Sequence, residues 1–220
     1  MYTPVPVEEK KKTAATKVAF VTAKRMFDVV VCILALPLFA VLFMVIGILI
    51  KIMDGGPVLY RSERIGKDGK PFLLYKFKTM EENADQILEQ LPPEMRQEYK
   101  TEFKLRNDPR VTKLGRMLRR SSLDELPQLI NILKNDMSLI GPRPVLDRET
   151  RLYGKNRALL LSMKPGLTGY WQAYARNDVG YANGKRQAME MYYVENCSLW
   201  LDLCILFATV GRVIGGKGAH

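Results

Sequence analysis

Two neighbouring carboxylates, Asp124 and Glu125, are the residues of this chain best suited to catalysis. Arginines stand on both sides of them, with Arg119 shortly before and Arg143 after. Mg²⁺ prefers oxygen ligands and often binds through one or two carboxylates plus substrate phosphates. An arginine guanidinium offers a two-pronged donor to a phosphate. The segment is therefore suited to holding a metal ion and a phosphate together.

A purely structural explanation competes with this chemical one. Ser122 and Glu125 have the spacing of a capping box, and acidic residues are favoured in the first turn of a helix. The local pattern alone favours this explanation. The two are compatible, because a helix that begins beneath Asp124 would also favour a bound phosphate.

Composition removes several classes of enzyme. The chain has 220 residues, and its one histidine is His220. A Ser-His-Asp triad, a Cys-His pair and a His-ligated zinc site are thereby excluded within this sequence. Three cysteines are too few for a disulfide framework and indicate a reduced, cytoplasmic setting. The net charge of +11 suits anionic partners such as lipid head groups, phosphorylated substrates or nucleic acid.

An uncharged apolar run over residues 29–50 indicates a membrane element. As a helix it would extend about 33 Å, enough for the hydrocarbon core of a bilayer. Basic residues flank both sides, among them Lys24, Arg25 and Lys51, although the positive-inside rule expects them on one side only. Pro37 would bend the helix. Both a simple span and a helix that returns to the same face fit, and the run alone favours the span.

The remaining elements predict an α+β fold that is mainly helical. Residues 58–65 and 71–77 read as two strands of a hairpin around Asp68-Gly69. Residues 81–105 are helix-prone and interrupted at Pro92-Pro93. Apolar periodicity predicts helices over 112–120, 123–134 and 185–196. Residues 198–214 fit an amphipathic helix at the membrane interface, with Trp200 at head-group depth.

Other motifs carry no functional claim alone. The prolines around Arg143 fix a turn and present its guanidinium rigidly, which suits phosphate recognition. The segment containing Lys76 and Lys78 fits a strand with one solvated face. Arg176 and Asn177 fit an ordinary loop.

Together these motifs resemble one family over residues 23–211. It is the bacterial sugar transferases, and in particular the small monotopic polyprenyl-phosphate phosphoglycosyl transferases. The resemblance rests, in chain order, on Lys24-Arg25-x-Phe27-Asp28, the apolar run with its proline, Tyr75-Lys76-Phe77-Lys78-Thr79-Met80, Ser122-Leu123-Asp124-Glu125-Leu126-Pro127-Gln128, Met137-Ser138-Leu139-Ile140-Gly141-Pro142-Arg143-Pro144 and Lys164-Pro165-Gly166-Leu167-Thr168-Gly169.

The resemblance implies a reaction. A phosphosugar passes from a UDP-sugar to a polyprenol phosphate such as undecaprenyl phosphate, and the products are a polyprenyl-diphosphate sugar and UMP. Asp124 is then the nucleophile that forms a phosphosugar-aspartyl intermediate. Glu125, with Asp124, is expected to hold Mg²⁺. The expected phosphate-contacting residues are Arg119, Arg143 and Lys78, and the expected nucleotide or sugar loop contains Arg176 and Asn177.

The resemblance also implies an arrangement in the membrane. Residues 1–23 would form a basic N-terminal segment, residues 24–54 a re-entrant helix broken near Pro37, and residues 55–220 a cytosolic catalytic domain with interfacial helices. A re-entrant helix replaces the transmembrane span that the apolar run alone favours. It also explains why basic residues stand on both sides of the run, since both ends would lie on the same side of the membrane. The expected location is the cytoplasmic face of a bacterial inner membrane, in contact with membrane lipids. A homodimer is a further expectation, and nucleic acid is not an expected partner.

This chain departs from the family pattern in three places. Leu36 precedes Pro37 where the family often has serine. Tyr181 and Glu190 stand where the family commonly has tryptophan and aspartate. The last two departures lie near the expected recognition loop, so the identity of the sugar does not transfer from the family.

Two other classes of function remain open on the sequence. One is a membrane-tethered module that binds anionic lipid or RNA, although no RNA-recognition signature is visible. The other is a catalytically silent scaffold that recruits glycosyltransferases, against which the intact Asp124-Glu125 pair argues.

Overall fold

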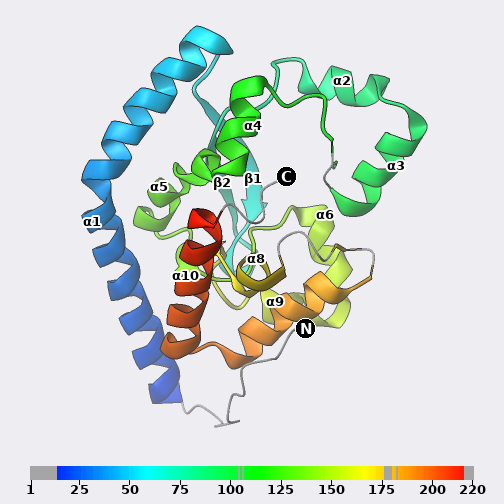
Figure 1. Ribbon diagram of the computed structural model, residues 1–220. Coiled ribbons are helices and arrows are strands. Elements are labelled where there is room, and N and C mark those ends of the chain that lie inside the picture. The colour runs from blue at the N-terminus through cyan, green and yellow to red at the C-terminus, as the bar shows by residue number, and fades with distance from the viewer. Residues whose placement is uncertain (1–13, 104, 106, 176–179, 182, 216–220) are drawn as a thin grey trace.

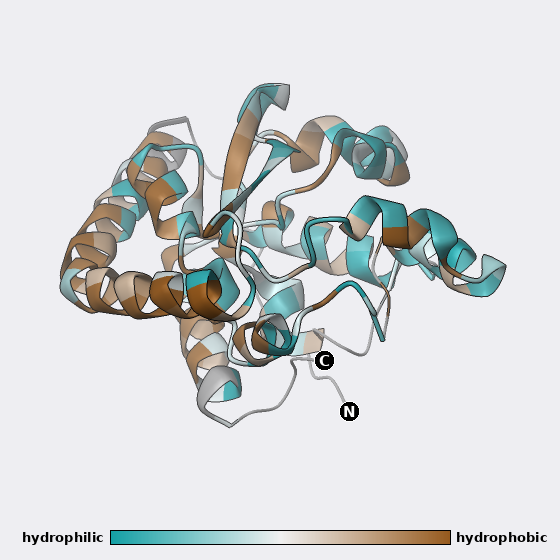
Figure 2. Ribbon diagram, turned by 90° about the horizontal axis from the view of Figure 1, so that it is seen from above, coloured by the Kyte–Doolittle hydropathy of each residue, from teal (hydrophilic) through white to brown (hydrophobic). Residues whose placement is uncertain are grey.

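A long helix lies along one side of the other elements, which are mainly helical (Figure 1). The computed structural model describes residues 14–215 except 104, 106, 176–179 and 182. Helix α1 (Ala14–Met53) continues through Pro37 and bends visibly along its length (Figure 1). Within Val18–Met53 it is long and apolar enough to cross a membrane, by length and composition. Apolar residues predominate along it, and most of them are exposed (Figure 2). These features support membrane association, while the re-entrant path and the three-part division stay predictions.

The predicted hairpin is confirmed. Strands β1 (Leu59–Ile65) and β2 (Pro71–Phe77) pair antiparallel, with Leu59 opposite Phe77 and Ile65 opposite Pro71. The turn between them contains Asp68 at φ 58° and Gly69 at φ 77°. Asp and Gly tolerate this left-handed region, which explains why the Asp-Gly pair marks the turn.

A second, smaller sheet joins two segments for which the sequence analysis predicted no strand. Strands β3 (Ser138–Ile140) and β4 (Gly166–Thr168) pair in parallel. The backbone at Gly141, just after β3, packs closely against the backbone at Gly166 and Gly169, at the start of β4 and just after it. A Cβ atom added to Gly166 would lie 2.1 Å from the backbone nitrogen of Gly141, and one added to Gly169 would lie 2.2 Å from its carbonyl oxygen. Glycine is required there because the two backbones leave no room for a side chain.

Most of the predicted helices form, with one correction. The interruption predicted at Pro92-Pro93 within residues 81–105 is confirmed, because one helix, α2, ends at Gln90 and the next, α3, begins at Pro93. The single helix expected over residues 123–134 is instead a three-residue 3₁₀ turn, η2 (Leu123–Glu125), followed by a separate helix that begins after Pro127. The helices after α1 are α2 (Ala84–Gln90), α3 (Pro93–Glu102), α4 (Lys113–Arg120), α5 (Gln128–Leu133), α6 (Asp147–Thr150), α7 (Arg157–Leu160), α8 (Tyr170–Ala175), α9 (Lys185–Asn196) and α10 (Leu199–Ile214), with a further 3₁₀ segment η3 (Arg151–Asn156).

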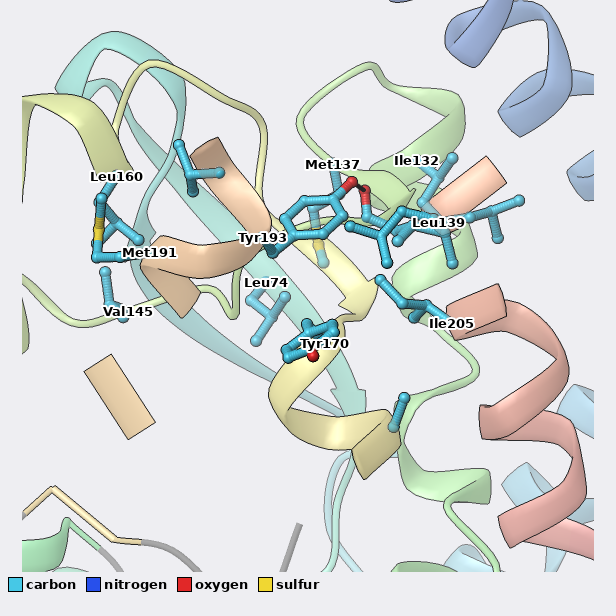
Figure 3. Close-up of a cluster of buried hydrophobic side chains, with 14 of the residues drawn as sticks. Leu74, Ile132, Met137, Leu139, Val145, Leu160, Tyr170, Met191, Tyr193 and Ile205 are labelled. Atoms are coloured by element: carbon cyan, nitrogen blue, oxygen red, sulfur yellow. Dashed lines mark hydrogen bonds between the residues drawn. The ribbon is translucent and has the colours of Figure 1, made fainter. Parts of the chain in front are cut away.

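The main core lies between the first hairpin, the small parallel sheet and the C-terminal helices (Figure 3). Tyr193 of α9 and Ile205 of α10 are both fully buried in it. Ile132 of α5 and Leu74 of β2 contribute from earlier in the chain. The core therefore fixes β2 against the C-terminal half of the chain, together with α5, which follows the two candidate carboxylates in the sequence.

Polar contacts fasten the first part of α1 to this core. The Lys24 ammonium lies 2.6 Å from the Asp202 carboxylate of α10, and Tyr193 donates to the other oxygen of that carboxylate at 2.7 Å. Arg25 donates to the carbonyl of Ile132 at 2.7 Å. Asp28 accepts from the backbone N–H of Leu139 at 2.9 Å. The side chains of Lys24 and Arg25 thus bind other parts of the protein. Their positive charges are therefore weaker evidence for the orientation of α1 in a membrane than their place in the sequence suggests.

Helix α10 has one buried face and one exposed apolar face. Asp202 and Leu201 are buried, whereas Trp200 and Phe207 are 70% and 71% exposed. This pattern agrees with the amphipathic helix expected over residues 198–214.

Candidate active site

The two carboxylates lie in the η2 turn between α4 and α5. Asp124 is buried and Glu125 is half-buried. Ser122 enters the turn with φ 59°, a left-handed conformation that is costly for a residue with a Cβ atom. Its side chain makes no capping hydrogen bond. The predicted capping box is therefore wrong, and because α5 begins only at Gln128, Asp124 lies in the short η2 turn and not in the first turn of an α-helix.

A lysine that the sequence analysis did not select lies against both carboxylates. The Lys76 ammonium is 2.6 Å from Oε1 of Glu125 and 3.9 Å from Oδ2 of Asp124. It comes from β2, whose pairing with β1 fixes which side of the strand it occupies. A cation held in this position offsets the repulsion between two adjacent negative charges.

Lys78, which was expected to contact phosphate, lies elsewhere. Its ammonium donates to the carbonyls of Asp54 and Gly55 at 3.4 and 3.2 Å, and it lies 3.6 Å from the Glu82 carboxylate. These contacts hold the turn that follows α1. The structure therefore brings Lys76, and not Lys78, to the two carboxylates.

Arg119 is held at the end of α4 by a contact with the segment after β2. Its Nε donates to the hydroxyl of Thr79 at 3.0 Å. Helix α4 can approach that segment because Gly115 has no side chain, since an added Cβ would lie 2.2 Å from the Thr79 carbonyl oxygen. Burial lowers the pKa of Arg119, while the negative charge of Asp124 opposes this shift. The guanidinium and the Asp124 carboxylate thus interact electrostatically, as expected for two parts of one site.

Arg143 lies in the turn after β3, and a buried glutamate holds its backbone. The N–H of Arg143 donates to both carboxylate oxygens of Glu190, at 3.3 and 3.1 Å. Burial disfavours the charged guanidinium, but the surrounding acidic groups, with Glu125 the largest contributor and Glu149 the next, raise its pKa on balance. Arg143 is therefore electrostatically linked to Glu125, and its turn is fixed by a residue of α9.

Glu190 is the most deeply buried carboxylate near the site, with 1% of its surface exposed. Burial raises its pKa to about 7, against the opposing charges of Arg186 and Arg143. The Arg186 guanidinium is stacked between Trp171 and Tyr181, at 4.1 and 4.0 Å from the two rings. Sequence reasoning noted Glu190 only as a departure from a family pattern. Its contact with Arg143 is long-range and has no local signal.

A small pocket opens beside Glu125, and Lys76 and Arg143 also line it. Its wall includes Arg64, Lys76, Glu125, Gln128, Arg143 and Gln172. Three guanidinium or ammonium groups thus line one small space with a carboxylate. Such a space suits an anionic ligand that is rich in oxygen acceptors.

Three further predicted site residues have roles that stay predictions. Arg176 and Asn177 lie outside the described residues, so the expected recognition loop stays a prediction. Pro37 lies within the continuous helix α1. Its expected role as the break of a membrane helix also stays a prediction.

The two carboxylates suit a metal that takes most of its ligands from the substrate. Within the described residues there is no cluster of three or more His, Cys, Asp or Glu side chains that would form a complete metal site. Mg²⁺ commonly uses only one or two carboxylates and completes its shell with phosphate oxygens and water. Asp124 and Glu125 fit that partial donor set.

The chain also matches known proteins over most of its length. A family model described as bacterial sugar transferase matches residues 19–216. The chain is 45% identical over 213 residues to the exopolysaccharide production protein ExoY of Rhizobium meliloti, covering 96% of this chain and 93% of that protein.

Two further relatives are longer. The chain is 44% identical to the undecaprenyl-phosphate galactose phosphotransferase of Salmonella typhimurium, covering 90% of this chain and 41% of that protein. It is 36% identical to the UDP-N-acetylgalactosamine-undecaprenyl-phosphate N-acetylgalactosaminephosphotransferase of Aeromonas hydrophila, covering 90% of this chain and 45% of that protein. The chain thus spans less than half the length of these two. A family match over nearly the whole chain, together with a full-length relative at this identity, establishes that the chain belongs to the bacterial sugar transferase family.

Proposed function

We propose that this chain transfers a sugar 1-phosphate from a UDP-sugar to a polyprenol phosphate, giving a polyprenyl-diphosphate sugar and UMP. The family membership supports transfer of a sugar. The names of two relatives support a phosphosugar as the transferred group and undecaprenyl phosphate as the acceptor. The observation that carries the proposal is the Asp124-Glu125 pair, held beside Lys76 at a pocket lined by Arg143.

The reaction proceeds in two successive displacements at the phosphorus atom that bears the sugar. A carboxylate oxygen of Asp124 attacks the phosphorus atom that bears the sugar, the bond from that phosphorus to the oxygen of UMP breaks, and UMP leaves. An oxygen of the polyprenol phosphate then attacks the same phosphorus, and the bond to Asp124 breaks. A carboxylate is a weak nucleophile, but it is ionised at neutral pH without a partner base. The absence of an internal histidine is therefore no obstacle.

The cations of the site have distinct roles in this scheme. Lys76 holds the carboxylates in place and offsets their mutual repulsion. Arg119 and Arg143 bind phosphate oxygens, where negative charge is concentrated in the transition state. Thr79 orients Arg119, and Glu190 orients the turn that carries Arg143.

Mg²⁺ is part of the proposal, with Asp124 and Glu125 as its protein ligands. When bound, it would neutralise charge on the diphosphate and make UMP a better leaving group.

We place the reaction at the cytoplasmic face of a bacterial inner membrane. The apolar, mostly exposed surface of α1 supports membrane association. The bend of α1 and the exposed Trp200 and Phe207 on α10 support a re-entrant helix with α10 at the head groups. Such an arrangement would bring a soluble UDP-sugar and a lipid phosphate to the same carboxylates. Accessibility labelling at both ends of α1 tests it, since an N-terminus on the opposite side of the membrane from the catalytic unit would overturn it.

One experiment tests the reaction and its nucleophile together. The purified protein is given a panel of UDP-sugars, with and without undecaprenyl phosphate, and UMP release is measured. We expect stoichiometric UMP and a covalent mass increase of one phosphosugar without acceptor, and repeated turnover with it. Asp124→Asn should show neither, while remaining in the membrane fraction. Turnover by Asp124→Asn, or UMP release that always requires the acceptor, would overturn the two-step scheme.

A further inference from the structure

A continuous row of aromatic rings and guanidinium groups connects the end of α3 with Arg143. The Arg143 guanidinium lies 5.8 Å from the centre of the Trp171 ring, and the Arg186 guanidinium lies 4.1 Å from the same centre. Arg186 is also 4.0 Å from the centre of the Tyr181 ring. The Tyr181 ring meets the Phe103 ring edge to face, with 5.6 Å between their centres. Each spacing lies within the range of cation–π or aromatic contact, so these five side chains form one ring–guanidinium row.

Packing alone does not explain an arginine in the middle of this row. Only 4% of Arg186 is exposed, and its Nε and Nη2 have no hydrogen-bond partner. Burial lowers the pKa of Arg186, the positive charge of Arg143 lowers it further, and Glu190 is among the groups that oppose the shift. An apolar side chain of similar size would fill this space without the cost of burying a charge and unpaired donors. What the guanidinium gains is its contact with two rings, and such contacts are strongest where water is excluded.

Phe103 stands where a residue without a side chain is favoured. It ends α3 with φ 55°, in the left-handed region where helices commonly end on glycine. A Cβ atom makes this conformation costly, and such strain persists where the surrounding structure needs the side chain. The Phe103 ring contacts Tyr181, and the Arg148 guanidinium lies 5.0 Å from its centre. The contacts of the ring therefore explain why phenylalanine stands at this position.

The end of α3 also holds the backbone next to Tyr181. The Glu102 carboxylate accepts from the N–H of Tyr181 at 2.9 Å. A Cβ atom added to Gly180 would lie 2.3 Å from an oxygen of the same carboxylate, so the two segments are closely packed. The hydroxyl of Tyr181 is buried and has no hydrogen-bond partner. The ring of Tyr181, and not its hydroxyl, is therefore the part that joins the row.

Arg143 belongs both to the row and to the candidate active site. Glu190 accepts from its backbone N–H and so fixes the turn that carries it. A fixed backbone still leaves several rotatable bonds between Cα and the guanidinium, and the contact with Trp171 restricts them. A guanidinium that is already held loses less conformational freedom when it binds a phosphate. It is also in place when negative charge develops on that phosphate.

We propose that Phe103, Tyr181, Arg186 and Trp171 are positioning residues for the Arg143 guanidinium, so that the end of α3 acts on the rate of phosphosugar transfer through the row. This inference rests on the proposed function, in which Arg143 binds phosphate oxygens. It gives the helical excursion that ends at Phe103 a part in the reaction from outside the candidate active site.

The test measures the first displacement by itself. Without acceptor, the amplitude of the UMP burst gives the fraction of active protein, and its rate constant gives the rate of the reaction at Asp124. Phe103→Leu is compared with Phe72→Leu, because both phenylalanines are partly buried against the same core and Phe72 lies on β2, outside the row. We expect Phe103→Leu to lower the rate constant about tenfold at saturating UDP-sugar. The donor concentration for half-maximal rate should change less than about twofold, because the contact of Arg143 is strongest in the transition state.

A purely structural role would give a different result. A substitution that only weakened the fold would lower the burst amplitude and the melting temperature and would leave the rate constant unchanged. Phe72→Leu should behave in this way. The same outcome for Phe103→Leu would overturn the proposal.

Tyr181 offers a matched pair of variants at one position. Tyr181→Phe keeps the ring and removes only the unpaired hydroxyl, so its rate constant should stay within about twofold of the unsubstituted value. Tyr181→Leu removes the ring and should lose as much as Phe103→Leu. Equal losses in the two Tyr181 variants would contradict the proposal, because they would assign the effect to the hydroxyl. Should Phe103→Leu fail to fold, as judged by its burst amplitude, this pair decides the question.

Removal of Arg143 gives the decisive comparison. Arg143→Met should lower the rate constant about 100-fold, the scale for losing one electrostatic contact at a reacting centre. Adding Phe103→Leu should then lower it by less than about twofold more, because the row acts through the missing guanidinium. A second tenfold loss in the double variant would overturn the row and leave the proposed function standing. If the unsubstituted protein gave no burst with any UDP-sugar, both would fall.

Discussion

The Lys24 ammonium and the Asp202 carboxylate lie 2.6 Å apart, although they come from the first and the last helix of the described chain. Both side chains are buried, with 11% and 4% of their surface exposed. Tyr193 donates to the second oxygen of Asp202 and so completes a small polar cluster beneath α1. The membrane helix is therefore joined to the catalytic unit by a specific buried ion pair as well as by apolar packing.

Removing one partner of this pair should destabilise the protein strongly. Lys24→Met leaves the Asp202 charge buried and unpaired, and such a change costs about 3 kcal/mol or more. The double variant Lys24→Met/Asp202→Leu should recover part of the loss. Denaturation in detergent checks this, with Lys100→Met on the exposed face of α3 as the control. Equal stability of Lys24→Met and the control would contradict the prediction.

Lys76 and Lys78 should respond differently to the same substitution. Lys76→Met removes the cation beside Asp124 and Glu125, so we expect kcat to fall by about 100-fold, the scale for losing one electrostatic contact at a reacting centre. Lys78→Met removes contacts to the turn after α1 and should chiefly lower the melting temperature. UMP release and thermal melting, measured on both variants, separate the two effects. A larger loss of kcat in Lys78→Met would reverse our assignment.

Gly115→Ala should disturb the site without touching a charged residue. The added methyl group would lie 2.2 Å from the Thr79 carbonyl oxygen, so α4 must move away from the segment that orients Arg119. We expect a loss of stability of about 1–3 kcal/mol, as for other overpacked sites, and a lower kcat. Gly211→Ala on α10 is the matched control, because its Cβ meets nothing within 4 Å. Wild-type kcat in a folded Gly115→Ala would argue against the Thr79–Arg119 contact.

Glu190 should make stability depend on pH. Its folded-state pKa is raised to about 7 by burial, whereas an unfolded glutamate titrates near pH 4.3. The folded state therefore binds the proton more tightly, and the stabilisation from protonation is full below about pH 4.3 and is lost as the pH rises to about 7. The melting temperature should therefore fall as the pH is raised across this range, because the stabilisation from protonated Glu190 is lost. Glu190→Gln should flatten the fall, and Glu195→Gln, exposed on the same helix, should not.

Activity should depend on a divalent cation. Because Asp124 and Glu125 are only two carboxylates, we expect weak metal binding without substrate and stronger binding with UDP-sugar. EDTA should abolish UMP release, and added Mg²⁺ should restore it. Full turnover in EDTA would remove the metal-binding role from both residues. Glu125→Gln should raise the Mg²⁺ concentration needed for half-maximal rate.

Local signals predicted much of the fold. The Asp68-Gly69 turn and the break at Pro92-Pro93 both act within a few residues. The Asp124-Glu125 pair and its neighbouring Arg119 were visible for the same reason. These features depend on backbone geometry and on charges that are adjacent in the chain.

The rest depends on contacts between distant segments, which one sequence does not reveal. Two lysines two residues apart are equivalent by pattern, and only the fold shows that Lys76, inside β2, reaches the carboxylates, whereas Lys78 follows the end of the strand. Pro127 was part of the motif, yet its effect of separating η2 from α5 was missed. The contact of Glu190 with Arg143 joins α9 to the turn after β3, so no local pattern marks it.

The crossing of the turns at Gly141, Gly166 and Gly169 limits how this enzyme can be re-engineered. The turn that carries Arg143 and the segment that leads into α8, and so to Gln172, share one interface in which backbone meets backbone. A chimaera that takes residues 164–172 from a relative would meet a host turn shaped for a different partner. The two segments must therefore be exchanged as one unit, so the smallest piece that can be transplanted is discontinuous in sequence.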